Sequence, residues 1–310
     1  MNAKSSVWPL AALALLVIGL PSVLPDYGLV LGFGLFVAAG MALSWNLVGG
    51  ITGQFALGHA LYLGVGAYVL AVGTTMTDWP LWSVVLLALL ACAVLAGLSA
   101  AAFLRMRAAY FSVATMGLAL AAMALVVTMP SLGATAGITL PGDLPLDDRR
   151  LFWAAGGGLC LTLWITDRIL RSPFGLSLMA IRDDEQAAAE CGVNPLLLKC
   201  AAMALSGAMA GGFGVLVALQ KQMVEPMSAF SMNWTIQMIM MCVIGGLGSL
   251  WGPVLGALLL FSLQQLLDEL AVWNLLVTAV ILVATIRLSP GGLVQLFARL
   301  RAGRTARSGH

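Results

Sequence analysis

Residues 171–195 read RSPFGLSLMAIRDDEQAAAECGVNP and form a charged segment between two long apolar stretches. Ser172 is suited to cap the start of a helix, and Pro173 suits its first turn. Gly192 suits the left-handed residue just past a helix end, and the Asn-Pro pair that follows suits the start of the next helix. The segment is too polar to cross a bilayer. We therefore predict one stiff, ordered helix that lies outside the lipid and offers a docking surface.

The rest of the chain is dominated by apolar residues. Of its 310 residues, 61% are hydrophobic and 9% are charged. A soluble domain carries about 25% charged residues, so these few charges could not cover a soluble surface. We predict an integral membrane protein of the all-α class, a polytopic transmembrane helical bundle. No basic patch with interleaved aromatic residues indicates nucleic acid as a partner.

Apolar stretches recur at the length of about 20 residues that crosses a bilayer core. They predict about ten spans, or eight or nine if 55–74 is re-entrant or if 252–288 divides differently. The first stretch could pass for a signal peptide, but another span follows at once, and we expect it to be retained. The predicted spans are 8–25, 28–48, 55–74, 81–104, 110–130, 151–169, 196–219, 231–247, 252–270 and 271–288.

The basic residues orient these spans, because cytoplasmic loops carry an excess of Lys and Arg. With both termini inside, 12 of the 15 Lys and Arg residues are cytoplasmic, and only Arg149, Arg150 and Lys221 are outside. This orientation puts the segment 172–195 in the cytoplasm. It also predicts one membrane domain over 1–295 and a basic cytoplasmic tail over 296–310. The inner basic residues are Lys4, Arg105, Arg107, Arg168, Arg171, Arg182, Lys199, Arg287, Arg299, Arg301, Arg304 and Arg307.

Sites of catalysis and ion relay are missing from the sequence. No span carries a convincing charged residue at its middle, which argues against a proton-coupled carrier, although sodium coupling through backbone carbonyls stays open. Phosphate-loop, zinc-protease and nucleophile-elbow motifs are absent. The two histidines, His59 and His310, cannot form a metal cluster, and the five cysteines read as small apolar fillers. We predict no catalytic residue, no metal and no cofactor bound by this chain, so any ATP must be hydrolysed by another chain.

Three further stretches mix polar residues or glycines into the apolar pattern. They are NLVGGITGQFALGHALYLGVGAY at 46–68, LRMRAAYFSVATMG at 104–117 and VIGGLGSLWGP at 243–253. Irregular backbone at membrane depth is tolerated only beside protein or water, so the first stretch is a candidate pathway lining. The alternative is that Gln54 and His59 satisfy helix ends and fix packing. The candidate pathway residues are Asn46, Gln54, His59, Tyr62, Thr115 and Gln237.

Glycines four residues apart occur in several spans. Gly207 with Gly211 and Gly252 with Gly256 are examples. Such spacing lets helix backbones approach closely in lipid, so we expect tight packing at these positions.

Together these stretches resemble the permease subunits of branched-chain amino acid ABC transporters, most closely the LivM type. The resemblance runs from about residue 40 to 290 in the family's order and spacing. It is carried by Gly53-Gln54-x-x-Leu57-Gly58-His59-Ala60, Arg107 with Tyr110-Phe111, Thr135-Ala-Gly-Ile-Thr-Leu-Pro141, Ile181-Arg-Asp-Asp-Glu185, Ala188-Ala189-x-x-Gly192 and Gly245-Gly-Leu-Gly-Ser-Leu-Trp-Gly-Pro253. Ala108 and Ala109 stand where the family's glycine follows Arg107, and Tyr62 replaces a more usual phenylalanine.

The resemblance implies a bacterial inner-membrane, multi-pass importer subunit for branched-chain or related small amino acids. Its implied partners are a homologous second permease, two cytoplasmic ATPases that hold ATP and Mg, a periplasmic substrate-binding protein and the lipid bilayer. The segment 172–195 corresponds to the coupling helix on which the ATPases dock. The coupling residues are then Arg182, Asp183, Asp184, Glu185, Ala188, Glu190 and Gly192.

Other functions stay open at this point. Asp183, Asp184 and Glu185 could form only a solvated helix face. The alternative function is an ATP-independent carrier or channel for a small polar solute, including urea or an amide, which close relatives carry. An integral-membrane enzyme fits worst, because polar catalytic sets are missing.

Overall fold

The computed structural model of the chain describes residues 7–22, 24–77, 79–103, 106, 108–142, 147–267, 280 and 292–294. Over these residues the chain is a helical bundle with one two-residue β ladder. The elements are α1 (Val7–Gly19), η2 (Leu20–Ser22), α2 (Asp26–Asn46), η3 (Leu47–Ile51), α3 (His59–Met76), α4 (Leu81–Phe103), α5 (Ala108–Thr128), η4 (Pro130–Leu132), β1 (Ile138–Thr139), α6 (Asp148–Leu170), α7 (Pro173–Asp183), α8 (Glu185–Glu190), α9 (Pro195–Lys221), β2 (Met223–Val224), α10 (Pro226–Ala229), α11 (Met232–Gly245) and α12 (Gly252–Leu266).

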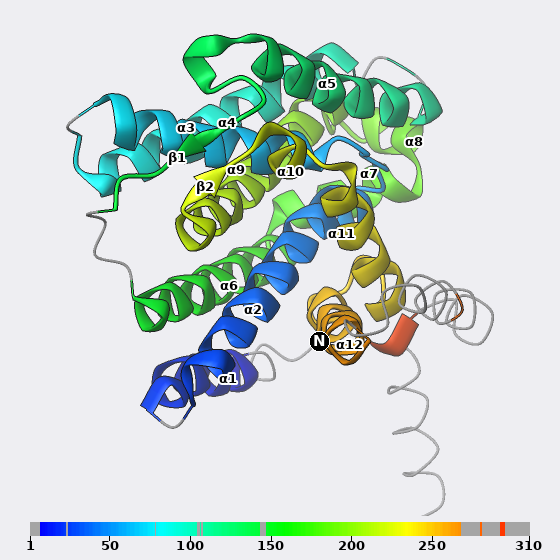
Figure 1. The fold of residues 1–310 in the computed structure, drawn as a ribbon. Coiled ribbons are helices and arrows are strands. Elements are labelled where there is room, and N and C mark those ends of the chain that lie inside the picture. Colours follow the sequence, from blue (N-terminus) through cyan, green and yellow to red (C-terminus); the bar gives the residue numbers. More distant parts are fainter. Residues whose placement is uncertain are drawn as a thin grey trace, which may run out of the picture.

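The bundle is arranged around α9. This helix has 27 residues, about 40 Å of length, and it packs against α3 and α4 on one side and against α2 and α6 on the other. Figure 1 shows α5 at the edge beyond α3 and α4, with α1 beside α6 at the opposite edge. α11 and α12 pack on α2 and on each other. The predicted all-α membrane bundle is therefore the observed architecture.

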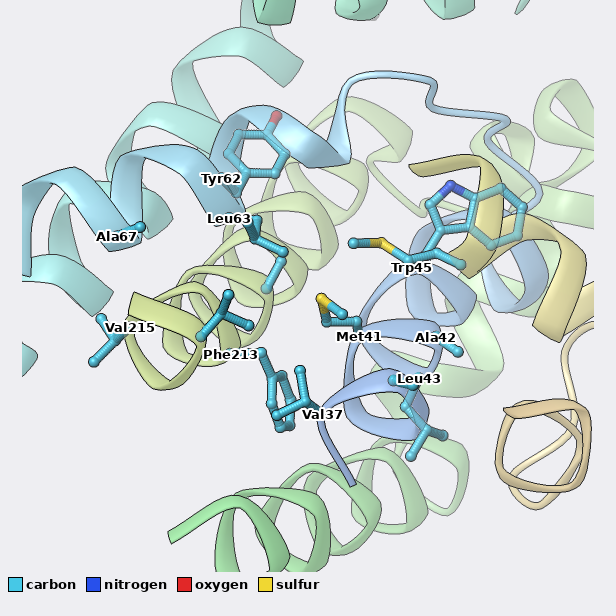
Figure 2. Close-up of a cluster of buried hydrophobic side chains, with 14 of the residues drawn as sticks. Val37, Met41, Ala42, Leu43, Trp45, Tyr62, Leu63, Ala67, Phe213 and Val215 are labelled. Atoms are coloured by element: carbon cyan, nitrogen blue, oxygen red, sulfur yellow. The ribbon is translucent and has the colours of Figure 1, made fainter. Parts of the chain in front are cut away.

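The centre of the bundle is a buried apolar cluster between α2, α3 and α9. Figure 2 shows Val37 and Met41 of α2 near Leu63 of α3 and Phe213 of α9, with Trp45 farther along α2 in the same buried cluster. All of these side chains are at most 4% exposed. Burial in a lipid-embedded bundle is stabilised by close packing, because lipid tails are themselves apolar.

Small residues bring the helix backbones together, as the glycine spacing predicted. A Cβ on Gly66 of α3 would overlap the carbonyl oxygen of Gly211 in α9, and one on Gly214 would overlap the carbonyl oxygen of Leu63. Gly207 lies equally close to Ala96 of α4. Larger residues at these positions would force the helices apart.

Six described helical stretches are long and apolar enough to cross a membrane. They are Asp26–Ile51, His59–Met76, Leu81–Phe103, Ala109–Thr128, Pro195–Lys221 and Pro226–Gly245. α1 and α12 are shorter apolar helices, and α6 covers the predicted span 151–169 without reaching the hydropathy of the six. The prediction of ten spans thus stays untested. The predicted span 271–288 and the tail 296–310 lie outside the described residues.

The third predicted span begins later than expected. It was placed at 55–74, but α3 begins at His59, because residues 52–58 are irregular. Gly53 has φ +76°, in the left-handed region, which ends the helical path that comes from α2.

The loops sort to two ends of the bundle. At one end β1 pairs antiparallel with β2, with Ile138 opposite Val224. At the other end Asn46 bonds to Gly248, and Arg182 bonds to Gly50. This sorting is compatible with the predicted orientation, in which the ladder is outside and the second group is cytoplasmic. The ladder itself was not predicted.

The orientation can be tested with a native thiol. Cys191 is exposed after α8, whereas the other described cysteines are buried or half-buried. We expect a membrane-impermeant maleimide to label Cys191 only from the cytoplasmic side. In a Cys191→Ser background, Met227→Cys at the opposite end, where Met227 is 64% exposed, should be labelled only from outside. Labelling of Cys191 in intact cells would contradict the orientation.

Candidate functional site

The predicted coupling segment consists of two short helices, not of one stiff helix. α7 ends at Asp183, and Asp184 interrupts the path with extended angles, φ −156° and ψ 109°. The Asp184 carboxylate accepts hydrogen bonds from the backbone N–H groups of Gln186 (2.9 Å) and Ala187 (3.1 Å). It thereby caps α8, a role for which Asp is among the best residues. The single-helix prediction was wrong because it treated Asp184 as part of a charged face.

The ends of the segment are as predicted. Ser172 Oγ accepts a hydrogen bond from Gly175 N (3.2 Å), and Pro173 occupies the first position of α7. Gly192 has φ +85°, which suits a residue without a side chain. Asn194 Oδ1 then caps α9 by accepting from the N–H of Leu197 at 3.2 Å.

Arg182 points from α7 into the bundle end. Its Nη1 donates to the carbonyl oxygen of Gly50, at 3.1 Å, and its Nε lies 3.3 Å from Asp183 Oδ1. A Cβ on Gly53 would lie 2.5 Å from Arg182 Cγ, and one on Gly248 would lie 3.0 Å from Nη1. A side chain at Gly53 would therefore crowd the stem of the arginine, and one at Gly248 would lie against its guanidinium.

The segment that receives Arg182 is a break between α2 and α3. α2 continues into the π-helical turn η3, a form often found at functional positions, and residues 52–58 are irregular. Asn46, which is 0% exposed, donates from Nδ2 to Ser249 O (3.0 Å) and accepts at Oδ1 from Gly248 N (2.9 Å). Trp45 Nε1 donates to Ala56 O at 2.8 Å. These side chains satisfy irregular backbone that could not be exposed to lipid.

α8 is attached to a different helix. Lys199 Nζ in the first turns of α9 lies 2.7 Å from Glu185 Oε2. The side chain of Lys199 is 11% exposed and that of Glu185 is 53% exposed. Ala188 is buried, at 6% exposure. Glu185 is therefore the ion-pair partner that compensates the charge of this largely enclosed lysine.

The predicted coupling residues therefore divide into two sets. Arg182, Asp183, Asp184, Glu185 and Ala188 make contacts within the chain. The remaining predicted residues, Glu190 and Gly192, are exposed without a side-chain contact among the described ones, and Leu176, Gln186, Ala187 and Ala189 are exposed as well. We call Leu176, Gln186, Ala187, Ala189 and Glu190 the outer face of the segment.

The predicted pathway residues lie mostly inside the bundle. His59 Nε2 and Ser206 Oγ are 2.8 Å apart, and Ser206 Oγ donates to Ser44 O at 2.6 Å. Tyr62 OH lies 2.8 Å from Ser99 Oγ. These bonds join α3 to α9, α2 and α4, which is the packing role left open for His59.

The other pathway candidates are spread over the molecule. Thr115 Oγ1 accepts from the N–H of Leu57 at 3.2 Å, and Asn46 belongs to the break described above. Gln54 is 8% exposed, and its side-chain amide has no partner among the described residues. Gln237 of α11 lines a separate cavity of about 230 Å³. The structure does not bring the six together, and a pathway role for them stays a prediction.

A larger cavity lies beside α5 and was not predicted. It has a volume of about 690 Å³, is open on one side, and is lined mainly by α3, α4 and α5 together with Phe230. Val65, Leu118 and Leu125 are typical of its lining, and Tyr68 and Thr77 are the hydroxyl-bearing side chains among the described residues that line it. Aliphatic residues in a span carry no motif, so no sequence signal distinguished this lining from lipid-facing positions.

Metal chemistry has no support in the described part of the chain. No group of three or more His, Cys, Asp or Glu residues is placed there to hold a metal ion.

Comparison with known proteins gives a consistent result. A family model described as the permease component of branched-chain amino acid transport systems matches residues 29–286. The high-affinity branched-chain amino acid transport system permease protein LivM of Escherichia coli K12 is 27% identical over 294 residues, which cover 83% of this chain and 67% of that protein. The LivM protein of Salmonella typhimurium is 26% identical over 286 residues, with the same two coverages.

A second kind of transport protein is also similar. The autoinducer 2 import system permease protein LsrC of Escherichia coli O9:H4 is 27% identical over 187 residues, which cover 53% of this chain and 54% of that protein. No solved structure matches the chain.

Proposed function

Because the chain belongs to the permease-component family of branched-chain amino acid transport systems, we propose that it is the membrane subunit of an ATP-driven importer whose motor docks on α7 and α8. The observation that carries this proposal is the construction of the segment. α7 and α8 lie outside the six long apolar helices, yet each is tied to the bundle by its own contact. Their outer face exposes Leu176 together with the small and polar side chains of α8 to a partner.

The motor would be supplied by other chains. Two cytoplasmic ATPases holding ATP and Mg, a second permease and a periplasmic binding protein complete the proposed importer in the bacterial inner membrane. ATP binding can move the bundle only if the two permease conformations bind the ATPases with different affinities. Stiff helices seated in a groove meet this need better than exposed ion pairs, which contribute about 0–1 kcal/mol each.

We propose a branched-chain or similarly aliphatic amino acid as the substrate. The LivM relatives are named for branched-chain amino acids. The cavity of about 690 Å³ supports this choice over urea or short amides, because its lining offers apolar surface and few hydrogen-bonding groups. A solute with no apolar part would lose hydration there without compensation.

Reconstitution in proteoliposomes tests this function. We expect uptake of radiolabelled leucine only when the ATPases, the second permease, the binding protein and ATP are all present. Uptake by the chain alone, at the same rate with and without ATP, would support the ATP-independent carrier or channel. Urea should compete poorly with leucine, and the orphan permease should insert into the membrane without transporting.

A further inference from the structure

Arg182 joins three segments that are distant in the sequence. It extends from α7, its Nη1 bonds to Gly50 O in η3, and the same nitrogen lies beside Gly248 in the loop between α11 and α12. We propose that Arg182 is a positioning residue that makes α7, the α2 break and the 246–249 loop move as one unit. The proposal rests on the proposed function, since it assigns the route by which motion of the docked segment enters the spans.

The Gly50 carbonyl accepts Arg182 because the helix ends nearby. Thr52 N donates to Leu47 O, and Gln54 N donates to Val48 O. The backbone then leaves the helical path at Gly53, so the described contacts include no later N–H that bonds to Gly50 O. The charged guanidinium fills that place, and a bond from a charged donor is roughly twice as strong as a neutral one.

The glycines around Arg182 make its position specific. Gly53 and Gly248 have φ values of +76° and +72°, and both lie against the arginine side chain. A side chain at either position would meet Arg182 as well as adopting a strained backbone. The two loops are thus shaped around the arginine, as expected of a built contact and not of a chance surface pair.

Asn46 also belongs to the junction, by which we mean the contact of α7, the α2 break and the 246–249 loop around Arg182. Its amide bonds to Gly248 N and Ser249 O, so the α2 break and the 246–249 loop are already held together. Arg182 adds α7 to that pair. If α7 is displaced, the guanidinium must either carry the break and the loop with it or lose its bond to Gly50.

Arginine suits this role better than lysine. Its planar group presents several donors in a fixed fork, whereas an ammonium is a point charge on a flexible stem. The exposed contact between Arg182 and Asp183 is the less important one, because Asp183 is 72% exposed and surface pairs contribute little. Arg168→Ala serves as the control, because it removes an exposed guanidinium from the last turn of α6, outside α7, α8 and the junction.

The experiment uses the complete reconstituted importer. For Arg182→Ala we expect ATPase subunits to remain bound and to hydrolyse ATP, while leucine uptake falls at least tenfold, so that ATP is consumed without transport. Arg182→Lys should retain part of the uptake, and Arg168→Ala should behave like the parent. Hydrogen exchange adds a direct readout: nucleotide should change protection of residues 47–58 and 173–190 together in the parent, but only of 173–190 in Arg182→Ala.

The outcomes separate this inference from the proposed function. If the parent complex couples ATP to uptake and Arg182→Ala does so equally well, Arg182 has no positioning role and the importer function stands. Loss of ATPase binding in Arg182→Ala would make the arginine part of the docking surface and would also overturn the inference. A parent chain that never binds an ATPase contradicts the proposed function itself.

Discussion

Gly66→Val is expected to destabilise the folded chain strongly and to lower its unfolding temperature. The added Cβ overlaps the backbone carbonyl oxygen of Gly211, which cannot rotate aside as a side chain can. α3 and α9 would have to separate along a contact that continues at Gly214 and Leu63. Overpacking costs about 1–3 kcal/mol where side chains can adjust, and we expect at least the upper value here. Against a total stability of about 5–15 kcal/mol this is a large loss.

The matched control is Gly117→Val in α5. No atom lies within 4 Å of the position that its Cβ would occupy. Valine there changes helix propensity only slightly, so the purified protein should unfold at the parent temperature. Thermal unfolding in detergent, followed by size-exclusion chromatography, compares both variants with the parent. Equal unfolding temperatures for Gly66→Val and the parent would show that α3 and α9 do not pack as closely as described.

Glu185→Lys is expected to lower ATP-driven uptake about thirtyfold. The change puts a second cation 2.7 Å from the place of the Lys199 ammonium, whose side chain is 11% exposed. At an effective dielectric constant of 20, the Coulomb energy of two cations at this distance is several kcal/mol less favourable than that of the native ion pair. The half-exposed position of Glu185 reduces this to about 2 kcal/mol through solvent screening. Repulsion between the two cations would then separate α8 from α9, and movement of α8 by a docked ATPase would no longer be transmitted to α9.

The reversed pair provides the rescue. Glu185→Lys combined with Lys199→Glu restores opposite charges in the same place, so uptake should return to within about threefold of the parent. Glu225→Lys, at an exposed carboxylate on the opposite end of the bundle, makes the same charge change without a described ion partner and should have little effect. If the double variant is as inactive as the single one, the ion pair is not what holds α8 in register.

Local chemistry made much of the coupling segment predictable. Ser172, Pro173 and Gly192 act where their residue types indicated. The break at Asp184 carried a signal as well, because Asp is a strong N-cap and Glu185 follows it as the first residue of a new helix. That signal was outweighed by the longer pattern of a continuous polar helix.

Contacts between distant residues could not be predicted in the same way. Nothing near Asn46 in the chain indicates that its amide bonds to residues 248 and 249. For Arg182 the sequence indicates a charge on a cytoplasmic helix, but not that it points inward to Gly50. The large apolar cavity is a further case, since its lining residues have the same chemistry as lipid-facing ones.

Because the segment bends at Asp184, one movement of a docked ATPase would act on two different helices of the proposed importer. α7 contacts the break that follows α2 through Arg182, whereas α8 contacts the first turns of α9 through the ion pair of Glu185 with Lys199. α9 is a continuous rod that ends beside β2, at the far side of the bundle. In the proposed importer, a tilt of the α8 end of α9 would therefore move the β2 end of the same rigid helix, so that one helix would link the two sides of the bundle.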